Sequence, residues 1–194
     1  IGAVGLGTIS PNYSNAWLNV GQNYAITATP VTGFLFTNWM GGTTLPLSLL
    51  TNGPTVQFMM ASNLTLQVTF ADVTKPTLSI TNLVAGQRVS NAVFTVKGKA
   101  GDNWQVSNVL CQIDGGAWNS ATNINNWTNW SAGVTLMPGT NTVAAYAVDT
   151  SGNLSVTNTV SFQFVVTNQL QISAIGLGTI SPNYSNAWLN VGQN

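Results

Sequence analysis

A stretch of nineteen residues occurs twice in the chain, as GLGTISPNYSNAWLNVGQN at Gly5–Asn23 and again at Gly176–Asn194. The residues just upstream match less closely, because IGAV at Ile1–Val4 corresponds to ISAI at Ile172–Ile175. The two copies are 176 − 5 = 171 residues apart. An internal repeat of fixed spacing constrains the architecture more than any single motif, because repeated sequence specifies repeated structural units. We therefore expect a repeat unit of 171 residues, with the second copy as the opening of the next unit.

Charged side chains are rare. Lysine and arginine together number 4, aspartate and glutamate together number 4, and histidine is absent, while 44% of the residues are hydrophobic. Such a chain can bury a core, and its surface must be kept wet by neutral polar groups, chiefly asparagine and threonine. Nucleic-acid binding is excluded as a function class because it needs a basic patch. Membrane insertion within this segment is excluded because no apolar run approaches 18 residues.

Apolar residues alternate with polar ones over short runs that end in Gly, Pro, Asn or Asp, and this pattern is typical of short strands. No stretch has the helical period, so we predict an all-β chain. A charged, proline-containing segment, ADVTKP at Ala71–Pro76, marks a domain boundary, and VTNQLQ at Val166–Gln171 marks a second. The predicted domains are residues 1–73, residues 74–167, and a linker with a first hairpin at residues 168–194.

The first segment contains the stretch TATPVTGFLFTNWMGG and closes on Thr69-Phe70. This pattern resembles the divergent internalin-B-type repeat, a small module of bacterial surface proteins. The resemblance implies a small β module, either β-grasp-like or a small sheet. Phe34, Phe36 and Trp39 fall on its aromatic positions, and we expect them to anchor the core of this small domain.

The second segment contains KPTLSIT, VFTVKGKAGDN, VLCQIDGGAW and LMPGTNTVAAYAVDTSGN, followed by a closing apolar strand. It resembles a bacterial immunoglobulin-like domain, which implies a β-sandwich. The alternating pattern supports the same fold independently, since about seven short strands in about 95 residues suit an Ig-like sandwich.

Catalysis has little chemical basis in this sequence. Without His or Glu, the four Asp residues are the whole acid–base repertoire, and a Ser–His or Cys–His arrangement cannot be built. We therefore predict no enzymatic activity and no catalytic residues. The single Cys111 alternates with Val109 and Ile113 on one face of a strand, and we expect it to be a buried core thiol.

A calcium site is predicted at one pole of the sandwich. There the start of the first strand and two loops meet, which brings together Asp72, Asp102 with Asn103, and Asp149 with Asn153. Ca²⁺ takes six to eight oxygen ligands of these kinds, and related surface modules stiffen their linkers in this way. The alternative is that these carboxylates only cap their own turns. Ca²⁺ is the one cofactor that the sequence suggests.

Three tryptophans, Trp118, Trp127 and Trp130, stand among asparagines in GGAWNSATNINNWTNW. Exposed, they would stack on sugar rings as a glycan-binding site. Buried, they would fill the sandwich or pin a long loop.

An outer apolar face is predicted on the Ig-like domain. The small Ala145 and Ala147 suit a crowded core, so alternation sends Tyr146 and Val148 outward, together with Leu110 and Val165 on neighbouring strands. Monomeric proteins seldom leave such a patch wet, and we expect another module or chain to cover it.

These observations predict a structural repeat of a long extracellular bacterial fibre or stalk at the cell surface. Its expected partners are neighbouring repeats of the same chain and other copies of that chain. The alternative is an adhesin-type module that binds glycans through exposed tryptophan.

Overall fold

The computed structural model describes residues 1–173, 175–184 and 187–190. The chain divides into two compact units, each described here by itself. Unit 1 comprises Ile1–Lys75 with Thr150–Asn153, and unit 2 comprises Pro76–Asp149 with Leu154–Asn194. The described residues form strands and turns only, which confirms the all-β prediction. Within this described part, no helix is long and apolar enough to cross a membrane.

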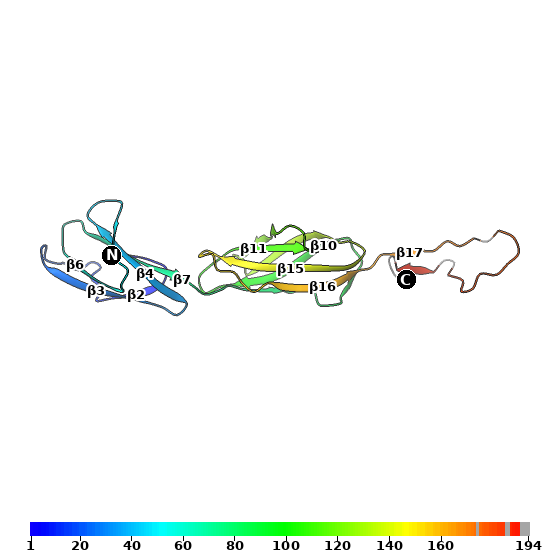
Figure 1. The fold of residues 1–194 in the computed structure, drawn as a ribbon, viewed down its shortest axis with the longest axis horizontal. Coiled ribbons are helices and arrows are strands. Elements are labelled where there is room, and N and C mark those ends of the chain that lie inside the picture. Colours follow the sequence, from blue (N-terminus) through cyan, green and yellow to red (C-terminus); the bar gives the residue numbers. More distant parts are fainter. Residues whose placement is uncertain (174, 185–186, 191–194) are drawn as a thin grey trace. The chain divides into compact units, whose positions relative to one another are not determined.

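Unit 1 is built from two small sheets, coloured blue to cyan in Figure 1. The four-stranded sheet has the order β1 (Gly2–Val4), β7 (Thr65–Asp72), β4 (Phe34–Gly42), β5 (Ser48–Thr51). The three-stranded sheet has the order β2 (Gly7–Ser10), β3 (Asn23–Pro30), β6 (Thr55–Met59). Strand β1 runs parallel to β7, and the other pairs are antiparallel. Of the two folds proposed for this module, the small-sheet one fits, because a β-grasp needs a helix and the described residues of unit 1 form none.

The core of unit 1 lies between the two sheets. Alternate residues of β3, β4 and β7 point inward, as expected for strands with one buried face. Trp39 is fully buried, and its Nε1–H donates to the carbonyl of Pro54 at 2.9 Å. Phe34 is buried and Phe36 packs against the same cluster, so all three predicted aromatic anchors serve the core.

The first ten residues of unit 1 join both sheets, because β1 pairs with β7 and β2 pairs with β3. Gly5, between the two strands, has a φ of 79°, a left-handed conformation that favours glycine. A Cβ added at Gly5 would meet the Phe70 carbonyl, and one added at Gly7 would meet the Phe70 ring. The backbone of this segment therefore packs directly on Phe70, which is itself buried.

Unit 2 is a two-layer sandwich, coloured green to orange in Figure 1. One sheet has the order β13 (Thr122–Ile124), β14 (Asn129–Thr135), β10 (Val93–Gly101), β8 (Thr77–Ile80). The other has the order β12 (Asn119–Ser120), β11 (Val106–Ile113), β15 (Gly139–Asp149), β16 (Asn158–Phe164), β9 (Arg88–Val89). In chain order, these sheets reproduce the ABED and CFG layers of a constant-type immunoglobulin domain, which confirms the predicted sandwich.

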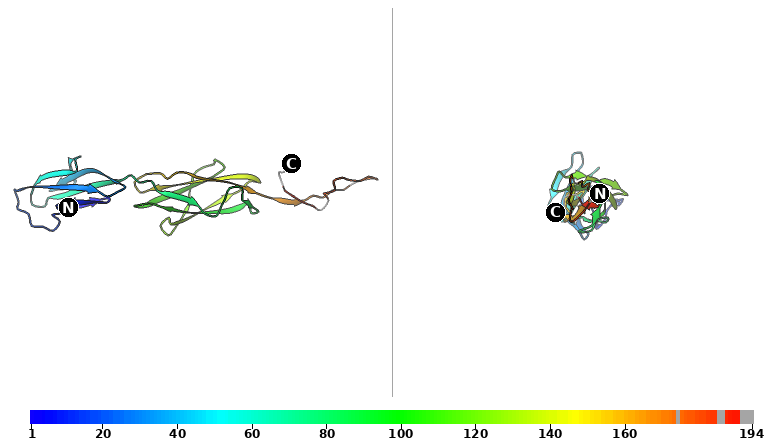
Figure 2. Two further views of the ribbon diagram at one scale, coloured as in Figure 1. Left: turned by 90° about the horizontal axis from the view of Figure 1, so that it is seen from below. Right: turned by 90° about the vertical axis from the view of Figure 1, so that its right-hand side faces the viewer.

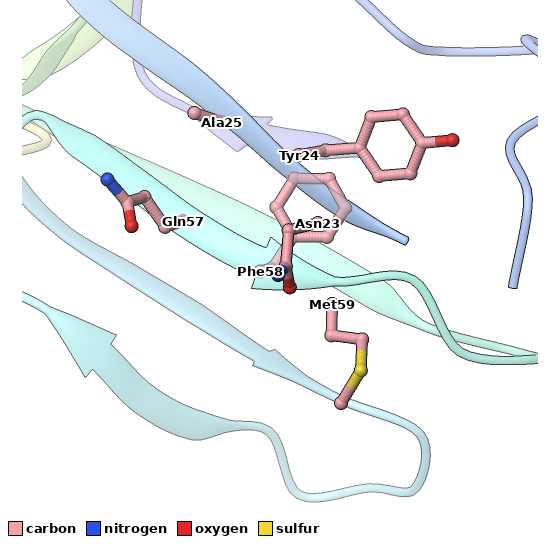
Figure 3. Close-up of a pocket in the computed structure, with 6 residues that line it drawn as sticks. All are labelled: Asn23, Tyr24, Ala25, Gln57, Phe58 and Met59. Carbon is pink, nitrogen blue, oxygen red and sulfur yellow. The ribbon is translucent and has the colours of Figure 1, made fainter. Parts of the chain in front are cut away.

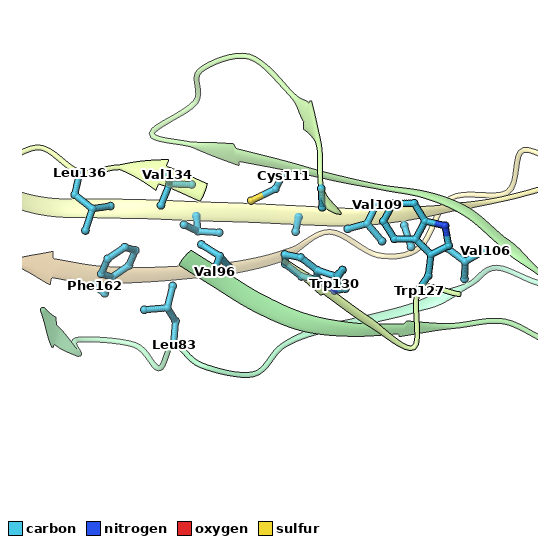
Figure 4. Close-up of a cluster of buried hydrophobic side chains, with 14 of the residues drawn as sticks. Leu83, Val96, Val106, Val109, Cys111, Trp127, Trp130, Val134, Leu136 and Phe162 are labelled. Atoms are coloured by element: carbon cyan, nitrogen blue, oxygen red, sulfur yellow. The ribbon is translucent and has the colours of Figure 1, made fainter. Parts of the chain in front are cut away.

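The core of unit 2 lies between these layers (Figure 4). Val96, Val109, Val143 and Phe162 are almost completely buried, and the Phe94 and Phe162 rings lie 6.0 Å apart. Inward residues alternate along each strand, so the core follows from the same period-two pattern that identified the strands.

The strands of unit 2 run between two poles (Figures 1 and 2). At the entry pole, Thr77 pairs with Gly101 and Val106 pairs with Asp149. At the exit pole, Gly139 pairs with Phe164. The chain thus enters the sandwich with β8 at one pole and leaves it with β16 at the other.

The last strand of unit 2 is held by a parallel partner. Gln163 pairs with Arg88 and Phe164 with Val89. Three further backbone bonds extend this contact beyond the strand bounds, from Gly86 to Ser161, from Gln163 to Gln87 and from Val165 to Val89, all 2.8–2.9 Å long.

Beyond β16, β17 (Thr167–Gln169) pairs antiparallel with β18 (Trp188–Asn190). The sequence predicts a linker and a first hairpin here. The pairing that forms joins the linker to the end of the second copy, and Gly178–Ser181, the counterpart of β2, forms no strand. The parts of this prediction that concern Ala174, Ser185, Asn186 and residues 191–194 lie outside the described residues.

Candidate functional site

The three tryptophans proposed to bind glycans occupy different environments. Trp130 is 1% exposed and Trp127 is 9% exposed, and both belong to the core of unit 2 (Figure 4). The glycan site predicted for these residues is therefore wrong for two of its three members. The buried alternative holds for them, because each indole fills space between the two sheets.

A left-handed turn directs Trp127 into the core. Asn125, Asn126 and Trp127 all have positive φ angles, of 52°, 52° and 68°. The Trp127 N–H donates to Asn123 Oδ1 at 2.8 Å, and its carbonyl accepts from the N–H of Ala100 at 3.1 Å. Asparagine tolerates this conformation better than most residues, which gives the Asn-Asn pair before Trp127 a structural reason.

Trp118 is 38% exposed, and its ring lies against Tyr146 with the centroids 4.7 Å apart and the planes at 73°. This edge-to-face geometry is favourable for aromatic pairs. Tyr146 lies outside the core, as the alternation predicts, while Ala145 and Ala147 are fully buried. The sequence analysis missed the contact itself, because Trp118 and Tyr146 lie on segments that only the fold brings together.

The other members of the predicted apolar face are half-buried. Leu110 pairs with Tyr146 across β11 and β15, and Val148 follows on the same face of β15. Val165 follows β16. The Trp118 ring covers part of this face from within the same unit, so the area left for a partner is smaller than the sequence suggests.

Asp102 and Asp149 meet at the entry pole of unit 2. Asp102 Oδ2 accepts from the N–H of Trp104 at 3.0 Å and of Gln105 at 3.2 Å, so it caps the turn after β10. Its Oδ1 is buried and accepts no hydrogen bond. Asp149 is 2% exposed, and carboxylate oxygens of the two residues lie within 4.8 Å of each other. Asn103, next to Asp102, is exposed.

Asp72 and Asn153 meet in unit 1. Asp72 ends β7 and is buried, and its Oδ1 accepts from the N–H of Thr74 at 3.0 Å. Asn153 donates from Nδ2 to the Asp72 carbonyl at 3.1 Å. Turn capping is therefore present at both Asp72 and Asp102. The remaining acid, Asp114, accepts from the N–H of Thr142 at 2.6 Å and likewise serves a turn.

Cys111 faces the core and is 3% exposed. Burial disfavours the thiolate and raises the pKa of Cys111 from 9.0 to about 11. A thiol that is neutral and shielded in this way is a packing residue, as the sequence predicts, and is unsuited to nucleophilic chemistry.

The outer face of the three-stranded sheet of unit 1 has an open hollow of about 360 Å³ (Figure 3). Asn23, Ala25, Gln57 and Met59 line it beside Tyr24 and Phe58, whose rings stack 5.9 Å apart. The small Ala25 side chain leaves the space. The charged residues are absent from its lining, so it offers neutral amide and apolar contacts only.

Residues 1–74 match the family described as the divergent InlB B-repeat domain. The match agrees with the resemblance found in the sequence and coincides with unit 1 up to its last residue, Lys75. No curated protein matches the chain.

Several solved structures share its general architecture. Fibronectin(III)-like modules of Clostridium thermocellum CbhA are 15% identical at a TM-score of 0.43, covering 82% of this chain and 94% of theirs. A mutant SrpA adhesin from Streptococcus sanguinis is 19% identical at 0.37, covering 48% and 58%. A modular mannanase from Cellulomonas fimi is 22% identical at 0.33, covering 46% and 18%. These scores carry no argument about function, and the assignment of unit 2 rests on its strand order.

Proposed function

We propose that this chain is a structural repeat of a long extracellular fibre or stalk on a bacterial surface, without an active site. Three sequence features support the proposal: the 171-residue spacing of the two copies, the B-repeat match of residues 1–74, and a surface almost free of charge. Neutral polar surfaces can pack against copies of themselves without electrostatic repulsion.

The observation that carries the proposal is the path of the chain through unit 2. The chain enters at one pole and leaves at the other, so each such domain carries it forward by the length of a strand. The eleven residues of β15 correspond to about 36 Å at about 3.3 Å per residue. Only residues 73–76 separate β7 from β8, which leaves little slack at this joint.

Electron microscopy of the natural full-length protein tests the proposal. We expect an extended particle with an axial repeat of roughly 60–80 Å for each 171-residue unit, the sum of two modules a few strand-lengths long. Collapsed particles, or beads joined at random angles, would contradict a structural fibre.

A glycan array tests the adhesin alternative. Trp118 is the member of the original trio with an exposed surface, so any specific glycan affinity should be lost in Trp118→Ala. Leu154→Ala is the control, because Leu154 is exposed and belongs to none of the proposed sites. Discrete affinity that disappears with Trp118 would replace the structural proposal by the adhesin one.

We further propose that Ca²⁺ binds at Asp102 and Asp149. The buried, unbonded Oδ1 of Asp102 and the nearby buried Asp149 carboxylate support this proposal, because two buried like charges are costly without a cation. Hard oxygen ligands suit Ca²⁺. Asn103 is the neighbouring amide, and Asp72 and Asn153 remain the further ligands that the sequence analysis suggests.

Chelation tests the calcium proposal. We expect EDTA to lower the melting temperature of unit 2 by several degrees and added Ca²⁺ to restore it, because a ligand that binds only the folded state stabilises it. Asp149→Asn should abolish this response, and Asp72→Asn shows whether Asp72 contributes. Asp114→Asn is the matched control. Melting that is indifferent to EDTA would leave turn capping as the only role of these carboxylates.

The half-buried face formed by Leu110, Tyr146, Val148 and Val165 is proposed as a contact between repeats or between molecules. Leu110→Ser should weaken lateral association of the protein without unfolding unit 2. Unchanged association would assign this face to the Trp118 contact alone.

A further inference from the structure

The opening segment of unit 1, residues 1–10, is held by partners distant in sequence. Gly2, Ala3 and Val4 pair with Gln67, Val68 and Thr69 of β7. Residues 7–10 pair with residues 27–30 of β3. Ile9 and Tyr13 then pack against the core. This segment is therefore a removable element in principle, since it adds one edge strand to each of the two sheets.

The corresponding second opening segment, residues 172–181, has none of these partners among the residues that the structure describes. Ile175 and Leu177 are fully exposed, and Ile180 is 41% exposed. A Cβ added at Gly176 or Gly178 would meet nothing within 4 Å, whereas the same addition at Gly5 or Gly7 meets Phe70. The same sequence is thus packed in one place and unpacked in the other.

The few sequence differences between the two segments fit the site that holds the first. Ser173 stands for Gly2, where an added Cβ would meet nothing within 4 Å. Ile175 stands for Val4, which is 50% exposed and leaves room for one more methylene group. From Gly176 onward the residues are identical to those from Gly5.

We propose that the second opening segment of one molecule replaces the first opening segment in unit 1 of another molecule. The exchange forms the same strand pairs and the same Phe70 contacts that it breaks, so its contact energy is almost balanced and protein concentration decides its extent. Exchange of an identical element between molecules is a low-cost route to assembly. This inference does not depend on the proposed fibre.

The path of the chain favours another molecule over unit 1 of the same chain. Unit 1 is joined covalently to the entry pole of unit 2, whereas the second opening segment follows the exit pole. Residues 165–171 between Phe164 and Ile172 reach about 24 Å when extended, less than the roughly 36 Å length of β15.

Paired glycine substitutions in the full chain test the exchange. Gly7→Val places a side chain against the Phe70 ring and should expel the molecule's own opening segment. The Gly7→Val chain should then complete unit 1 with residues 172–181 of a neighbour, and light scattering should show at least a twofold higher mass than the unsubstituted chain at equal concentration. Gly178→Val alone should stay monomeric, because Gly178 contacts nothing. The double variant should also be monomeric, because it has no competent segment.

A labelled peptide with the sequence of residues 172–190 provides a second measurement that does not require assembly. It should bind the double variant at least tenfold more tightly than it binds the unsubstituted chain, whose own segment competes. The same peptide with Val for Gly178 should bind at least tenfold more weakly. Three results would each overturn the proposal: no peptide binding to the double variant, equal association of the double and single variants, or a Gly7→Val chain that completes unit 1 as a monomer.

Discussion

Residues Gly7–Ser10 form strand β2 in unit 1, whereas the identical residues Gly178–Ser181 form no strand. The reverse holds further along, where Trp188–Asn190 form β18 and the identical Trp17–Asn19 form no strand. Sequence is constant in this comparison, so the difference comes from what lies beside each copy. The first copy has β3, β7 and Phe70, and the second copy pairs with Thr167–Gln169. A strand is thus specified by its partners as much as by its own residues.

The largest effect should come from removing the residue on which the first copy packs. Phe70→Ala deletes a buried ring and should lower the free energy of unfolding of unit 1 by about 3–5 kcal/mol. The first copy should then lose its hydrogen-exchange protection and become as exchangeable as the second. Denaturant unfolding combined with hydrogen exchange measures both quantities. Leu35→Ala on the exposed side of β4 is the control, and persistent protection of residues 7–10 in Phe70→Ala would contradict the comparison.

A somewhat smaller effect is expected from one substitution made in each copy. Gly5→Ala combines left-handed strain with a clash against the Phe70 carbonyl, and should destabilise unit 1 by about 2–4 kcal/mol. Gly176→Ala meets no neighbouring atom and should leave the denaturant midpoint of unit 1 unchanged. Equal effects of the two substitutions would show that both copies are packed alike.

The smallest effect sharpens the comparison by reporting on unit 2 alone. The pKa of Cys111 is about 11 in the folded chain because of burial, and 9.0 without it. Between these values the unfolded thiol ionises while the folded one stays neutral, so the unfolded state binds fewer protons and stability falls as pH rises. This thiol should lower the free energy of unfolding of unit 2 by up to about 1.4 kcal/mol per pH unit above pH 9.

Denaturant unfolding at pH 8 and pH 10 measures this slope, and Cys111→Ala should reduce it. In Phe70→Ala, Cys111 should remain unreactive toward a thiol reagent, because unit 2 has its own core. Rapid labelling of Cys111 in that variant would mean that the two cores do not fold separately.

The alternation of apolar residues made much of this fold predictable. It placed Ala145, Ala147 and Cys111 inside and Tyr146 outside, because residues two apart on a strand share a face. Composition and missing histidine left little basis for catalysis. Ig-like topology also predicted that Asp102 and Asp149 would come close, since both follow from which loops share a pole.

What the sequence left open depends on contacts between distant segments. Tryptophans among asparagines read equally well as exposed or buried, and only the turn at Asn125–Trp127 decides that Trp127 points inward. The Trp118–Tyr146 pair depends on the path of a long loop that no short-range pattern encodes. The second copy is the extreme case, because an identical sequence had already been placed on strands elsewhere in the chain.

The parallel pairing of β9 with β16 determines how unit 2 responds to tension. A pull on Pro76 and Phe164 draws the two poles apart along the strand direction, so the bonds that join Gln163 and Phe164 to β9 carry the load in shear and must yield together. Unit 1 has the same arrangement at its ends, since its first strand, β1, runs parallel to its last, β7. Bonds loaded one at a time would unzip under a small force, whereas these are loaded side by side. Each unit therefore resists stretching through its terminal strands, and a surface protein that must withstand flow would depend on that resistance.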